Sequence, residues 1–178
     1  AVAESAPPRF VARNQEIAQL NQYLKRAGTG QHQITFITGE PGSGKTALMH
    51  AFARQAMASY PDLLVASGKC SAYTGSGDPY SPFREILQML TGAVASRWEA
   101  GDISTDHARR LWAALPEVAA ALVGNGRLLL DRLIPSAELL HLAQVRTRHQ
   151  SPEQVPWLDE LAAWVKAEET AVPVAQTD

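Results

Sequence analysis

Residues 39–46 constrain this chain more than any other stretch. Three glycines stand in a short segment that ends in a lysine and a threonine: Gly39, Glu40, Pro41, Gly42, Ser43, Gly44, Lys45 and Thr46. Glycine accepts positive backbone torsions and leaves room for a bound group, so such a loop can turn its N–H groups inward around an anion. The spacing fits G-x-x-x-x-G-K-[ST], the phosphate-binding pattern of nucleoside-triphosphate sites.

The segments on either side of the loop support this interpretation. Residues 33–38 are typical of a buried strand, and residues 47–53 are typical of a helix. In a strand–loop–helix setting we expect Lys45 to reach the β- and γ-phosphates of ATP or GTP as the catalytic cation. We expect Thr46 to offer its hydroxyl to a bound Mg²⁺. The alternative is a glycine-rich turn with an exposed lysine.

Composition limits the partners. With a net charge of −2 over 178 residues, the chain favours no broad polyanion-binding surface, and we expect no nucleic acid to bind this segment. The one cysteine, Cys70, excludes an intrachain disulfide and fits a reducing cytoplasm. No apolar run approaches the roughly 20 residues that span a bilayer, so we expect no membrane contact.

The periodicity predicts an α/β fold. A helix is expected to run to about Ala27 with Asn14 as its N-cap, followed by a strand at 33–38, a helix from Lys45, and a second strand at 63–68. Together these would form a parallel β-α-β unit with a right-handed crossover. The sequence therefore predicts a three-layer αβα core with a partial parallel sheet, followed by a mostly helical C-terminal half.

Apolar spacing places further helices in that second half. They are expected near 83–90 (with Ser81 as N-cap), 106–115 continuing or kinking through 116–122, 128–134, 136–146 and 157–165. We expect a disordered lead-in at 1–8, the N-terminal part of a nucleotide-binding domain at 9–92, a helical insert or subdomain at 93–168, and a disordered tail at 169–178.

Other chemistry-bearing residues form weaker patterns. Asp131 follows three leucines and is the only candidate for a second, metal-positioning acid, although a helix-surface position suits it better. No two histidines pair at helical spacing, so no zinc site is expected. Trp157 and Trp164 lie on one helix face and are expected to pack into a core or against another domain. Ser43 is interpreted as a loop residue and not a nucleophile.

Several segments together resemble a known family. The residues that carry the resemblance are Phe10 to Ile17, Ile34 to Thr46, Cys70, and Pro79 to Phe83. They resemble the N-terminal part of AAA+-like nucleotide-binding modules, in particular the signal-transduction ATPases with numerous domains. In that family the opening Phe-Val-Gly-Arg-Glu lies near the adenine. Arg13 matches, whereas Ala12 and Asn14 replace the usual Gly and Glu. The resemblance implies an adenine contact by Val11 or Arg13.

The resemblance also implies a function. It indicates a Mg²⁺-ATP (or GTP) binding module of a cytoplasmic signalling ATPase, with the nucleotide as a conformational switch. In the family, a strand ending in a metal-positioning acid, a sensor strand and a helical lid follow, and none is recognisable here. We therefore expect binding without efficient turnover, and completion by the remainder of a larger protein or a partner chain. A small-molecule kinase and an assembly module with statically bound nucleotide remain alternatives.

Overall fold

A computed structural model describes residues 13–70 and 78–171. The chain divides into two compact units, Ala1–Leu63 and Leu64–Asp178. The expected lead-in at 1–8 and the tail from 172 lie outside the described residues. Residues 169–171 belong to the last helix. The other domain boundaries drawn from the sequence remain predictions.

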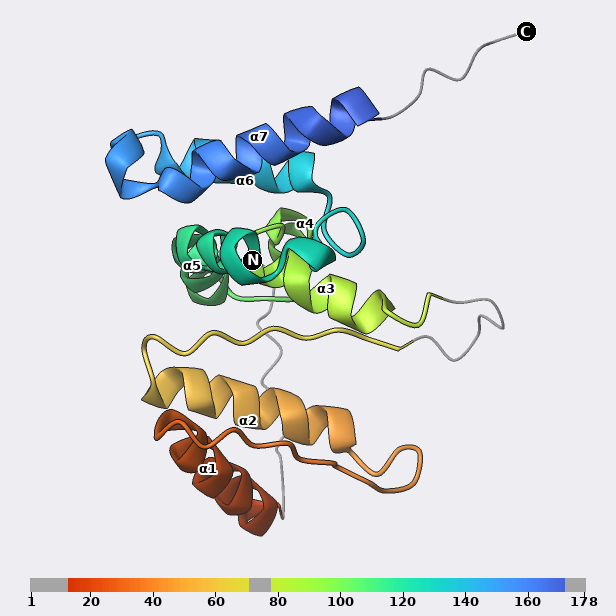
Figure 1. Cartoon of the computed structure of the whole chain (residues 1–178). Helices are drawn as coiled ribbons and strands as arrows, with labels where there is room; N and C mark the ends of the chain where they lie inside the picture. Colours follow the sequence, from red (N-terminus) through yellow and green to blue (C-terminus); the bar gives the residue numbers. More distant parts are fainter. Residues whose placement is uncertain (1–12, 71–77, 172–178) are drawn as a thin grey trace, which may run out of the picture. The chain divides into compact units, whose positions relative to one another are not determined.

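The first unit is a pair of helices around the glycine loop. Helix α1 spans Asn14–Gly28 and packs against α2, Lys45–Ser59 (Figure 1). Both helices were expected from their apolar spacing, and both are confirmed. Among the described residues of this unit, the buried side chains are Leu48 and Ala56, which lie two turns apart on α2. The core of the first unit is therefore small and centred on the helix that follows the loop.

The regular elements described in the second unit are helices, apart from one isolated bridge between Leu130 and Ile134. Its elements are α3 Ser81–Leu90, α4 Ala95–Glu99, α5 Thr105–Asn125, the 3₁₀ turn η1 Arg127–Leu129, α6 Ser136–Thr147, the 3₁₀ turn η2 Pro152–Gln154, and α7 Pro156–Ala171. Helix α5 contacts α3, α4, α6 and α7, and so forms the centre of the unit. Pro116 lies inside α5, which runs on as one helix. The expected helices near 83–90, 106–122, 136–146 and 157–165 are confirmed.

Two apolar clusters hold this unit together. The larger joins α5, α6 and α7 through Leu115, Leu122, Leu139 and Leu161, all buried. The smaller gathers Met89, Val94, Ala108 and Leu111, with Trp112 against it. The expectation that Trp157 packs into a core is confirmed, because it lies against the larger cluster.

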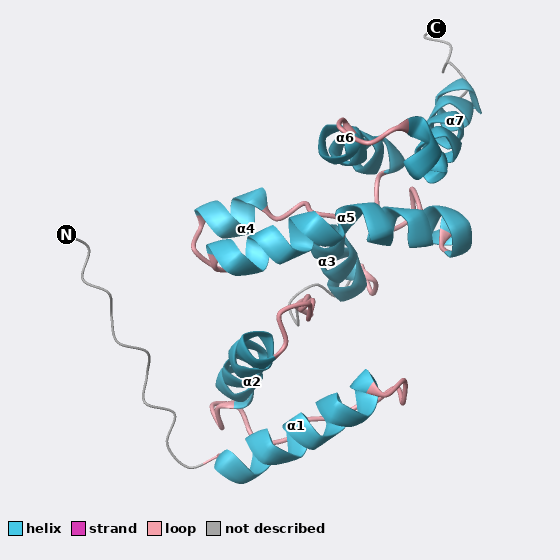
Figure 2. Cartoon of the chain, turned by 90° about the vertical axis from the view of Figure 1, so that its left-hand side faces the viewer, coloured by secondary structure: helices cyan, strands magenta, loops and turns pink. Residues whose placement is uncertain are grey.

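The predicted parallel sheet is wrong for the described residues. Neither 33–38 nor 63–68 is a strand, and Figure 2 shows only helices and loops in the part of the chain that is described. A strand needs a neighbour to accept its N–H and C=O groups. Here residues 33–38 and 64–68 belong to different compact units, and neither segment has a strand partner. The three-layer αβα core is therefore not observed.

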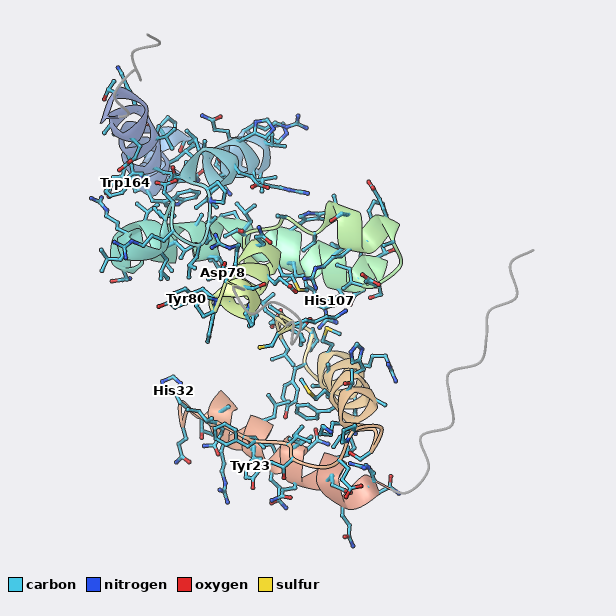
Figure 3. All side chains as sticks on the ribbon, turned by 90° about the vertical axis from the view of Figure 1, so that its right-hand side faces the viewer. Tyr23, His32, Asp78, Tyr80, His107 and Trp164 are labelled. Carbon is cyan, nitrogen blue, oxygen red and sulfur yellow. The ribbon has the colours of Figure 1, made fainter. Side chains whose placement is uncertain are left out.

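The second segment is held by helix side chains in place of a sheet. The Nε2 atom of His107, labelled in Figure 3, lies 2.7 Å from the carbonyl oxygen of Val65. The Ser67 N–H faces Met89 Sδ at 3.4 Å, and the Lys69 N–H donates to Glu85 Oε2 at 3.3 Å. These backbone groups alternate along the segment, so one edge of it is bound to the helical unit.

Local corrections concern one predicted helix and the N-terminal ends of two others. Residues 128–134 are not a helix, because η1 ends at Leu129 and Leu130 bridges to Ile134 across a turn. Asn14 and Ser81, expected as N-caps, are the first residues of α1 and α3. Their N-cap positions hold Arg13 and Tyr80, which make no side-chain capping bond.

Candidate functional site

The glycine loop adopts the backbone that its sequence requires. Gly39, Gly42 and Gly44 have φ angles of 154°, 78° and 83°, all in the range that favours glycine. A Cβ atom added at Gly42 or Gly44 would meet nothing within 4 Å, so backbone torsion is what demands glycine there. At Gly39 the added Cβ would lie 2.9 Å from Ser43 Oγ. Torsion and crowding both exclude a side chain at that position.

The loop leads directly into a helix N-terminus. Gly44 is the N-cap of α2, and the Leu48 N–H donates to its carbonyl at 2.9 Å. The N–H groups of Lys45, Thr46 and Ala47 precede that bond and have no intrahelical acceptor. The helix dipole adds positive potential at the same place, which suits an anion. Thr46 is exposed here, with its hydroxyl at the start of the helix.

The Lys45 ammonium folds back onto the loop. Its Nζ atom donates to the carbonyl oxygens of Gly39 and Glu40, at 2.8 Å each. The Lys45 side chain therefore reaches back across the loop to its first two residues, Gly39 and Glu40. An arriving phosphate would offer this ammonium a charged acceptor, which makes a stronger bond than a neutral carbonyl does.

Arg13 joins the loop from outside the motif. Its Nη2 atom donates to the main-chain carbonyl of Ser43. The resemblance implied an adenine contact for this residue, and that role remains a prediction. Val11, the other residue with that expected role, lies outside the described residues. The tether to Ser43 was missed, because sequence spacing does not show which main-chain atom a side chain reaches.

Ser43 itself carries an unusual hydroxyl. Its Oγ atom is buried and has no hydrogen-bond partner among the described residues. A buried hydroxyl without a partner costs free energy until a ligand or water reaches it. No histidine or carboxylate bonds to it in the described part of the chain, so nothing there would activate it as a nucleophile.

These features fit a triphosphate with its metal ion. The free N–H groups at the start of α2, the ammonium of Lys45 and the hydroxyl of Thr46 are the groups that bind phosphates and Mg²⁺ in such sites. Within residues 13–70 and 78–171, no three His, Cys, Asp or Glu side chains gather to hold a metal by themselves. Mg²⁺ keeps several waters and binds through substrate phosphates, so one protein hydroxyl suits it.

Asp131 has a structural position. It lies in the turn between η1 and α6 with a left-handed φ of 62°. Its Oδ1 atom accepts from the Ser136 N–H at 2.9 Å, and Oδ2 accepts from Trp164 Nε1 at 3.0 Å. Partial burial raises the pKa of Asp131, but these hydrogen bonds outweigh it and hold the pKa below its usual range. The carboxylate caps α6 and anchors α7, and the expected helix-surface position is corrected to a turn.

Sequence comparison places the chain in a family. The site is that of a phosphate-loop nucleotide-binding protein, by its glycine backbone and its Lys45-Thr46 helix start. A sequence model of the AAA ATPase domain matches residues 9–176, and the chain belongs to this family. It is a nucleotide-binding ATPase module, and the expected membership of the AAA+-like class is confirmed. No curated protein and no solved structure matched the chain significantly.

One further finding concerns membranes. No helix among residues 13–70 and 78–171 is both long enough and apolar enough to cross a bilayer.

Proposed function

We propose that this module binds Mg²⁺-ATP or Mg²⁺-GTP at residues 39–46 and works as a nucleotide-dependent conformational switch in a cytoplasmic signalling or regulatory ATPase. The observation that carries the proposal is the left-handed glycine loop that opens α2 with Lys45 folded over it. Lys45 and the free N–H groups of the helix bind the phosphates, and Thr46 ligates the metal.

The switch starts with Lys45. In the structure its ammonium is bonded to the Gly39 and Glu40 carbonyls. When a triphosphate binds, the ammonium transfers to the β- and γ-phosphate oxygens and releases those carbonyls. A bound triphosphate orders neighbouring segments in this way, and hydrolysis or dissociation releases them. The remainder of a larger protein, or a partner chain, would read the change.

Turnover by these 178 residues alone is expected to be slow. The one acid that the sequence offered as a metal ligand, Asp131, already accepts two hydrogen bonds that fix α6 and α7. A small-molecule kinase needs several arginines that converge on the transferred phosphate, and three arginines of the helical unit instead form ion pairs with carboxylates of that unit. Arg109 and Arg110 pair with Asp106, and Arg127 pairs with Glu160. A panel of sugar and nucleoside acceptors tests this second function by acceptor-dependent ADP release.

The direct test is a titration of fluorescent ATP with and without Mg²⁺. Lys45→Ala removes a charged hydrogen bond of about 1.5–3 kcal/mol, so the affinity should fall about 10- to 100-fold. Lys25→Ala is the matched control, because Lys25 is an exposed lysine in the last turn of α1 in the same unit. Equal affinity of the Lys45→Ala variant and the unmodified chain would reject the proposal.

A further inference from the structure

We propose that Arg13 is a positioning residue of the phosphate loop. By holding the Ser43 carbonyl it aims the Gly44 N–H at the phosphates and ties the loop to the start of α1. The inference rests on the proposed nucleotide binding at residues 39–46, and it assigns Arg13 to the phosphates of the ligand and not to its base.

The geometry of the peptide group between Ser43 and Gly44 sets the direction of the Gly44 N–H. The Ser43 C=O and the Gly44 N–H belong to the same planar peptide, and in the trans form they point in opposite directions. Arg13 donates to the carbonyl, so the N–H is directed away from the guanidinium. The Gly44 N–H donates to no protein acceptor among the described residues, and it stands at the N-cap of α2. It is therefore placed to bind an anion.

The positive charge of Arg13 also makes the Gly44 N–H a stronger donor. A hydrogen bond from a guanidinium is charge-assisted, and it polarises the peptide group that accepts it. A peptide whose carbonyl is bound to a cation has an N–H that donates more strongly. Gly44, with a φ of 83°, has no side chain to hold this peptide in place. Without Arg13, the peptide is free to rotate and the N–H loses its direction.

Arg13 also links the loop to a helix. Arg13 stands at the N-cap position of α1, and its own carbonyl accepts from the Ile17 N–H at 3.1 Å. One residue thus bonds through its main chain to the first turn of α1 and through its side chain to the loop. If the loop moves when nucleotide binds, Arg13 would transmit that movement to the N-terminal end of α1.

The test uses the whole chain with three ligands in Mg²⁺: ATP, GTP and inorganic tripolyphosphate. Arg13→Gln should weaken all three by the same factor, about tenfold, because one charged hydrogen bond that orients the site is lost. Arg13→Lys should recover part of the loss, since lysine keeps the charge but not the planar fork. Arg54→Gln, an exposed arginine on α2, is the matched control and should change nothing.

A second measurement needs no ligand. Amide hydrogen exchange at Leu48, whose N–H is bonded to the Gly44 carbonyl, should be faster in Arg13→Gln than in the unmodified chain, and unchanged in Arg54→Gln. If Arg13→Gln weakens ATP and GTP binding but leaves tripolyphosphate binding unchanged, Arg13 contacts the base and the inference is overturned. The inference is also overturned if Arg13→Gln binds each of the three ligands as tightly as the unmodified chain does. If no form of the chain binds any ligand, the proposed function fails, and the exchange rate at Leu48 still decides whether Arg13 holds the loop. If Arg13→Gln does not fold, Arg13→Lys supplies both measurements.

Discussion

The first unit, Ala1–Leu63, carries the phosphate loop on a small core, in which Leu48 and Ala56 are the buried hydrophobic residues among those described. The second unit, Leu64–Asp178, carries two apolar clusters joined by α5, and its described residues include no comparable loop. Ile34 and Phe36, beside the loop in the first unit, are 87% and 86% exposed. The conformation of the loop depends on local backbone torsions, so it needs little apolar core around it. The stability of the helical unit depends on the packing of its apolar side chains.

The largest expected effect is a loss of stability in the second, helical unit. Leu115→Ala should lower its free energy of unfolding by about 2–5 kcal/mol, because a fully buried leucine at the centre of the larger cluster leaves a cavity. The measurement is urea unfolding followed by tryptophan fluorescence, since all 4 tryptophans lie in this unit. Leu128→Ala is the control at an 83% exposed leucine and should cost less than about 0.5 kcal/mol. Equal losses would contradict the assignment of the core.

A smaller effect tests backbone fit in the same unit. Gly92 has a φ of 81°, and a Cβ there would lie 2.9 Å from Leu115 Cδ1. Gly92→Ala should therefore destabilise the unit by about 1–3 kcal/mol in the same unfolding assay. Gly124→Ala makes a control of opposite sign, because Gly124 lies inside α5 with open space around it. Gly124→Ala should raise the free energy of unfolding by about 0.5–1 kcal/mol. If it lowers that free energy, α5 requires glycine at this position.

The third effect concerns Asp131 and pH. Because the pKa of Asp131 is lowered by folding, its contribution is full above the unfolded pKa of about 3.9 and is lost as pH falls through the folded value. Asp131→Asn should cost about 1 kcal/mol at pH 7, since the amide cannot accept both bonds. The difference from the unmodified chain should shrink toward pH 3, as followed by thermal unfolding. A difference that stays constant with pH would rule out the carboxylate as its source.

The smallest expected effect lies in the first unit. Phe36→Ser should change the free energy of unfolding by less than about 0.5 kcal/mol, because the ring is 86% exposed. Far-UV circular dichroism is the measurement, since this unit has no tryptophan. A loss comparable to that of Leu115→Ala would mean that Phe36 is covered in solution, and the contrast between the units would disappear.

Much of the local structure could be predicted from the sequence. Apolar spacing predicted α1, α2, α3 and the long helices of the second unit, because a period of 3.6 residues is a local signal. The glycine pattern predicted a phosphate loop opening a helix, and the positive φ angles at Gly39, Gly42 and Gly44 agree with it. The predicted sheet failed for a physical reason. An apolar run shows that a segment can pair, but its partner must come from elsewhere in the chain.

The sequence by itself determined the glycine torsions, the helix that follows them and the Lys45-Thr46 pair, since each depends on neighbours within a few residues. The tertiary structure alone decided which atoms those side chains reach. Arg13 bonds to the Ser43 carbonyl across thirty positions. His107 bonds to Val65 and Trp164 to Asp131, across forty-two and thirty-three positions. Such contacts depend on how distant elements pack, and no local pattern encodes that.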